Sequence, residues 1–180
     1  MEDISDQIDK AFLARVYPGD ENITRCTYDK KYGGKYDGPC GECVTIAEFF
    51  RGKLWRELSA KELRSHGQAD VLFTVEAYCY YLPAYLTAAV CDREELDVCA
   101  DHLSYRFGPK AEDAFGQERL SKSFSTLTDI ELRPILSYFR YAHNLEEDFD
   151  GYCSRSILNV ERALQSPNKS LHPTAASGGG

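Results

Sequence analysis

Three capping boxes are the feature that most constrains the fold of this chain. They pair Ser59 with Glu62, Asp92 with Glu95, and Thr128 with Glu131. In a capping box the two side chains satisfy backbone N–H groups that the first turn of a helix leaves free. Apolar residues at helical spacing follow, such as Leu96, Cys99, Leu103 and Phe107 after the second box, and Ile135, Leu136, Phe139 and Ala142 after the third. Start signals and periodicity agree, so the sequence predicts a mostly α-helical protein.

Further helices are indicated elsewhere along the chain. One is predicted around Ile8, Phe12, Leu13 and Val16 before Pro18, another over 44–50, and a last one over 152–165. Residues 108–126 are polar and are expected to be irregular, with one turn at 118–122. The triplet 71–73 is the only β-leaning segment and is too short to imply a sheet. We expect a single compact domain of six to seven helices over residues 1–165.

Two segments lack helical periodicity. Tyr17 to Gly41 is rich in Gly, Asp, Lys and Tyr and is predicted to be a long loop. Long loops inside compact domains are often functional. Residues 166–180 contain one large apolar residue, Leu171, and are predicted to form a disordered tail.

The most apolar stretch, Ala77 to Cys91, is predicted to be a buried helix. Thr74 caps it, and Pro83 inside it is expected to kink it. Its 15 residues fall short of the ~18 that a membrane span needs. Three cysteines in helical, apolar surroundings are expected to pack in the core: Cys79, Cys91 and Cys99.

Charge and the N-terminal sequence limit the classes of partner and the compartment. The net charge of −8 argues against nucleic acid and anionic membranes as partners, since both select basic surfaces. Residues 1–10 contain neither the basic nor the apolar region of a signal peptide. An odd number of cysteines, seven, is typical of reduced thiols. These features predict a cytoplasmic protein.

One cysteine pattern indicates a metal site. Cys40 and Cys43 form a C-x-x-C pair, Cys26 lies fourteen residues earlier, and His66 is a candidate fourth ligand. Thiolates at this spacing can share zinc, which is the only cofactor that the pattern indicates. Two alternatives remain open, namely a redox pair in which Cys43 lies near a helix N-terminus, and unrelated thiols.

Two helix faces could carry a site. Tyr78, Tyr81 and Tyr85 form a stripe that could line a ligand pocket or contact a partner, although such stripes are more often core. Asp97, Asp101 and His102 form a charged cluster, but no nucleophile at a known distance makes it a catalytic triad.

The sequence favours three functions, in order. The first is a non-enzymatic interaction protein, of the immunity or antitoxin kind, which binds another protein; acidity, tyrosine content and the absence of catalytic motifs support it. The second is a zinc- or thiol-dependent module or enzyme that uses Cys26, Cys40 and Cys43. The third is a small-molecule binder that uses the tyrosine-rich helix.

Four segments resemble a family of uncharacterised bacterial proteins, a domain of unknown function. They are YPGDENIT at 17–24, the CGEC segment from Cys40 to Ile46, FFRGKLWREL at 49–58 and EAYCYYLPAYLTAAV at 76–90. The resemblance covers the first half of the chain and implies no activity. The tail segment NKSLHPTA at 168–175 is similar to tails of proteins encoded by integron gene cassettes, which implies a mobile bacterial gene of accessory function.

Overall fold

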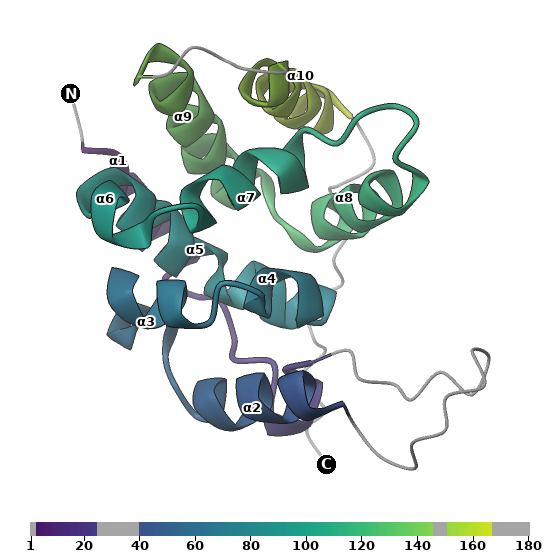
Figure 1. Ribbon diagram of the computed structural model, residues 1–180. Helices are drawn as coiled ribbons and strands as arrows, with labels where there is room; N and C mark the ends of the chain where they lie inside the picture. Colours follow the sequence, from purple (N-terminus) through teal and green to yellow (C-terminus); the bar gives the residue numbers. More distant parts are fainter. Residues whose placement is uncertain (1–2, 25–39, 146–150, 167–180) are drawn as a thin grey trace, which may run out of the picture.

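Helices are the main secondary structure of the described part of the chain, which also has one isolated β-bridge between Thr24 and Phe73. A computed structural model describes residues 3–24, 40–145 and 151–166 (Figure 1). These residues form ten α-helices and two short 3-10 helices, η1 and η3. The bounds are α1 Ile4–Phe12, η1 Asp20–Asn22, α2 Gly41–Phe50, η3 Trp55–Glu57, α3 Ala60–Ser65, α4 Ala69–Leu72, α5 Val75–Cys91, α6 Arg93–Leu96, α7 Cys99–Phe107, α8 Ala114–Thr126, α9 Asp129–Leu145 and α10 Tyr152–Gln165. The all-α prediction is confirmed, and the larger number of helices reflects short segments such as α4 and α6.

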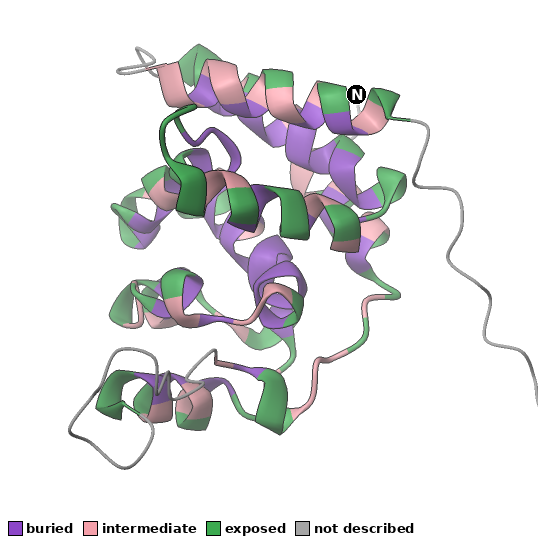
Figure 2. Cartoon of the chain, turned by 90° about the vertical axis from the view of Figure 1, so that its right-hand side faces the viewer, coloured by how far each residue is buried: buried purple, intermediate pink, exposed green. Residues whose placement is uncertain are grey.

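Helix α5 lies at the centre of the molecule, as its almost continuous burial shows (Figure 2). It packs against helices from both halves of the chain, including α1, α3, α7 and α8. The predicted cap is present, because Thr74 Oγ1 accepts a hydrogen bond from the Ala77 N–H at 3.0 Å. The helix runs through Pro83 as one element of 17 residues. The prediction of a buried core helix is therefore correct, and no helix among the described residues is long and apolar enough to cross a membrane.

Two of the three capping boxes are confirmed. Ser59 and Glu62 cap α3, and Thr128 and Glu131 cap α9. Asp92 makes no side-chain capping bond. It already ends α5, with φ −136° and ψ 44°, whereas an N-cap residue takes an extended conformation. The helix predicted after it is divided into α6 and α7 near Asp97, which has a positive φ of 57°.

The expectation of irregular structure over 108–126 is wrong for most of that segment. Helix α8 covers its last 13 residues, and the Asp113 side chain caps it by accepting from the Gly116 N–H at 2.9 Å. Only Arg119, Leu120 and Ser123 are buried on this helix. Two of these three are polar, so the helix lacks the apolar period by which it would have been recognised.

Smaller corrections concern the ends of helices. Helix α1 ends at Phe12, so Leu13 and Val16 are exposed instead of helical core positions. Cys79 and Cys99 are buried as predicted, but Cys91, the last residue of α5, is exposed. The structure gives the ends of the predicted loop, with η1 at one end, while residues 25–39 and the predicted tail from 167 onward lie outside the described part.

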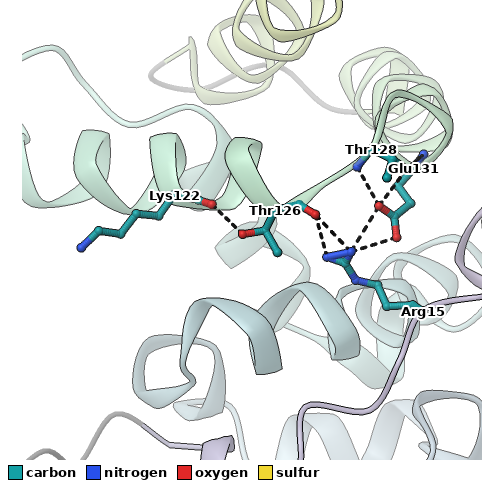
Figure 3. A network of polar contacts seen from close by, with 5 residues as sticks. All are labelled: Arg15, Lys122, Thr126, Thr128 and Glu131. Atoms are coloured by element: carbon teal, nitrogen blue, oxygen red, sulfur yellow. Dashed lines mark hydrogen bonds and ion pairs between the residues drawn. The ribbon is translucent and has the colours of Figure 1, made fainter. Parts of the chain in front are cut away.

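A buried ion pair joins the chain's beginning to its second half (Figure 3). Arg15, just after α1, contacts the Glu131 carboxylate at 3.1 Å and donates to the Thr126 carbonyl at 3.2 Å. The same carboxylate accepts from the backbone and hydroxyl of Thr128. Glu131 therefore caps α9 and anchors the segment after α1 at once.

Candidate functional site

The concave regions of the described surface include two that lie between helices. The larger, of about 430 Å³, runs between α1, η3 and α5. Its polar side chains are mainly exposed, and Arg56 neutralises Asp9 by an ion pair within it. The smaller, of about 240 Å³, lies between α4, α7 and α8, three helices whose arrangement Figure 1 shows. Buried charges line this second region, called the α4–α7–α8 pocket below, and it is the stronger candidate for a binding site.

Three helices build the α4–α7–α8 pocket. Helix α4 contributes Asp70 and Val71. Helix α7 contributes three residues at i, i+3 and i+4, which one helical face brings together: His102, Tyr105 and Arg106. Helix α8 and the residue that caps it contribute Asp113, Phe115, Gly116 and Arg119. The pocket therefore depends on α8, the helix that the sequence failed to predict.

Two arginines are buried in the wall of the pocket, where they are 6% and 8% exposed. The Arg106 guanidinium lies 4.0 Å from the centre of the buried Tyr78 ring and donates to Ser123 Oγ at 3.3 Å. Arg119 Nη2 donates to the carbonyl oxygens of Asp70 at 2.6 Å and Val71 at 3.4 Å. A ring and a hydroxyl thus hold the Arg106 guanidinium in place, and two backbone carbonyls hold that of Arg119.

One buried carboxylate, that of Asp70, also lines the pocket. The Asp70 Oδ1 atom lies 3.5 Å from His102 Nδ1, a distance suited to an ion pair when the imidazole is protonated. The polar contact with Asp70 raises the pKa of His102 above its ordinary value, and burial opposes this rise. The pair holds a positive charge on His102 over a wider pH range than an isolated histidine would.

The mouth of the pocket is apolar. Val71, Tyr105 and Phe115 are three large apolar or aromatic side chains that are 47%, 51% and 58% exposed, and all three line this pocket. Large apolar side chains at the surface carry meaning when they converge on one place. An apolar mouth over a few fixed polar groups is the usual composition of a small-molecule site.

The predicted tyrosines lie within the core, and of the three Tyr78 packs against the pocket residue Arg106. Tyr78, Tyr81 and Tyr85 are all at most 3% exposed, so their rings form no surface for a partner in this structure. Tyr81 donates its hydroxyl to the carbonyl of Phe50 at 2.8 Å. The hydroxyl oxygens of Tyr78 and Tyr85 are buried and form no hydrogen bond with any described residue. The charge of Asp70 contributes to a raised pKa for both, although burial is the larger cause.

The predicted zinc ligands are only partly within the described residues. Cys26 is outside them. Cys40 caps α2, its sulfur accepting from the Cys43 N–H at 3.3 Å, and Cys43 is buried. His66 stacks on Phe49 with ring centres 3.7 Å apart, and its Nδ1 lies 3.0 Å from the Glu62 carbonyl. That contact leaves Nε2 as the ring nitrogen for a metal. Among the described residues no group of three metal-binding side chains is found.

Most of the pocket residues carry no signal in the sequence. His102 lies close to Asp97 and Asp101 in the sequence, but these two form ion pairs with Arg64 and Arg93. The partner of His102 is Asp70, which is 32 residues earlier in the chain. The one local signal available was Asp113 as the N-cap of a polar helix.

No protein-family model, curated protein or solved structure matches this chain. The resemblance to the uncharacterised bacterial family and to gene-cassette tails therefore stays a prediction.

Proposed function

We propose that this chain is a binding protein for a small organic molecule, and that the ligand occupies the α4–α7–α8 pocket. The observation that carries the proposal is the convergence of three exposed apolar side chains, Val71, Tyr105 and Phe115, around a cavity with buried charged walls. The sequence also favours a small-molecule binder, as its third function, but it places the ligand at the tyrosine-rich helix. The proposal places the ligand in the α4–α7–α8 pocket instead.

The size of the cavity limits the ligand. About 240 Å³ lies just below the ~300 to 1,000 Å³ range of most ligand pockets, so one or two fused rings would fill it. Tyr105 and Phe115 at the mouth favour a flat molecule, because aromatic rings stack on such side chains. The interaction-protein and zinc functions stay predictions beside this one.

A pair of matched variants tests the proposal. Val71→Trp places an indole at the mouth of the pocket, whereas Val98→Trp alters another exposed valine that is not among the pocket residues. The probes are 2-naphthamide and 2-naphthoate, with thirteen non-hydrogen atoms each. At about 0.3 kcal/mol per atom, the dissociation constant is expected near 1 mM.

Backbone amide shifts in ¹H–¹⁵N NMR spectra provide the measurement. We expect saturable shifts on α4, α7 and α8 in the wild type and in Val98→Trp, and their loss in Val71→Trp. The proposal fails when neither probe shifts these amides up to about 10 mM. It also fails when Val71→Trp binds as well as the wild type.

A further inference from the structure

We infer that the ligand is an organic anion with a flat apolar body, and that Arg119 binds its carboxylate or phosphate group. This inference rests on the proposed function, because it names the class of molecule that the α4–α7–α8 pocket takes. The juxtaposition behind it is a buried guanidinium in the wall of a cavity with an aromatic mouth.

The surroundings of Arg119 leave its charge without a neutralising group. Its side chain is 8% exposed, and within the described residues no carboxylate forms an ion pair with it. Its described hydrogen bonds go to the backbone carbonyls of Asp70 and Val71, which are neutral. A buried charge is costly unless an opposite charge faces it. An anionic ligand would supply that charge.

Arg119 also has a hydrogen-bond donor that no described residue uses. The Nε atom is buried and has no hydrogen-bond partner among the described residues. Guanidinium groups present their N–H groups as a rigid planar fork, which matches two oxygens of a carboxylate or phosphate. The two carbonyl contacts through Nη2 fix the orientation of the fork before a ligand arrives. An anchored guanidinium loses little side-chain entropy on binding.

The other charges around the cavity favour an anion as well. Arg106 adds a second buried positive charge. The Asp70 carboxylate already faces His102, and the exposed Asp113 carboxylate already caps α8. Asp113 therefore has an N–H partner, and Asp70 has a positive partner 3.5 Å away whenever His102 is protonated. This pattern holds although the whole chain carries a net charge of −8.

A comparison of isosteric probes tests the charge preference. 2-Naphthoate and 2-naphthamide share size and shape, and only the first is charged above pH 6. We expect 2-naphthoate to bind the wild type about tenfold more tightly, the gain typical of one hydrogen bond to a charged group. Arg119→Gln should reduce this ratio to about one with little change in 2-naphthamide binding. Arg119→Lys should keep part of the preference, and the exposed Arg133→Gln should leave it unchanged.

Inorganic phosphate serves as a third probe. Weak competition of phosphate with 2-naphthoate, at tenfold or higher concentration, is expected because phosphate lacks the apolar body. Competition as strong as that of a naphthalene probe would overturn the requirement for an apolar body.

The wild-type ratio decides the inference even when Arg119→Gln does not fold, which a circular dichroism melt reveals. Equal binding of both naphthalene probes, or tighter binding of 2-naphthamide, overturns the inference and leaves the proposed function intact. A preference for 2-naphthoate that persists in a folded Arg119→Gln variant overturns the role of Arg119. Absence of binding by both probes is instead the failure of the proposed function.

Discussion

At the scale of single residues, the tyrosines of α5 differ in what their hydroxyls do. Tyr81 donates to the carbonyls of Phe50 and Lys53, at 2.8 and 3.3 Å, where α2 ends. The Tyr85 hydroxyl is buried and bonds to no described residue. A buried hydroxyl stabilises a fold only when it is hydrogen-bonded, since it gives up its water on folding. Tyrosines of one stripe therefore contribute differently to stability.

Removing these hydroxyls one at a time should separate the two cases. Tyr81→Phe is expected to lower the free energy of unfolding by about 1 kcal/mol, because two carbonyl contacts are lost. Tyr85→Phe should change it by less than about 0.5 kcal/mol or raise it, because the hydroxyl has no described partner to lose. Urea denaturation measures both values. An equal loss in the two variants would contradict this account.

At the scale of secondary-structure elements, hydrogen bonds in the first turn of a helix show which predicted capping boxes form. Ser59 has an extended backbone, and Ser59 and Thr128 each exchange hydrogen bonds with a glutamate three residues later. The bonds that Ser59 gives to the Glu62 carboxylate lower the pKa of Glu62 to about 2, with Lys53 contributing less. Asp92 has the same spacing to Glu95 but ends α5, and its side chain does not cap α6.

Alanine substitution at the three positions should reproduce this difference. Ser59→Ala and Thr128→Ala are each expected to lower the free energy of unfolding by about 1 kcal/mol, because the capping bond is lost. Asp92→Ala should cost less than about 0.5 kcal/mol, since it removes no cap. Thermal melts with calorimetric enthalpies provide the comparison. A loss at Asp92 as large as that at Ser59 would show that its side chain caps α6 in solution.

At the scale of the whole molecule, the Arg15 and Glu131 pair connects parts of the chain that are 116 residues apart (Figure 3). Their side chains are 12% and 6% exposed. The pair between Arg140 and Glu161 also connects two elements, α9 and α10, but its side chains are 59% and 33% exposed. Water screens the second pair and has little access to the first. The loss of one partner is therefore expected to change stability more in the first pair.

Loss of the arginine should therefore lower the free energy of unfolding much more in the buried pair than in the exposed pair. Arg15→Met is expected to lower the free energy of unfolding by about 3 kcal/mol, because it leaves the Glu131 carboxylate buried without its positive partner. Arg140→Met should cost less than about 1 kcal/mol. Chemical denaturation of both variants gives the comparison. Similar losses would contradict a special role for the buried pair.

The sequence by itself determined the helical class, the central helix and two of the three capping boxes. These features depend on neighbours within about four residues, through hydrogen bonds in one turn and an apolar period along one helix. Such local interactions can be predicted from the order of the residues alone. The helix over 152–165 was predicted with its observed bounds for the same reason.

Only the tertiary structure decided where the candidate site lies. The pocket joins Asp70, His102 and Arg119 from three helices, and no local pattern links positions so far apart in the chain. Helix α8 escaped prediction because it buries arginine and serine, which carry no apolar signal. The sequence shows the tyrosine stripe, but packing against the other helices decides that the stripe is core and that the candidate site is the α4–α7–α8 pocket. Burial is a property of the folded molecule and cannot be seen in the order of the residues. Because Arg119 is buried, its charge favours an opposite charge on a ligand more than an exposed arginine would.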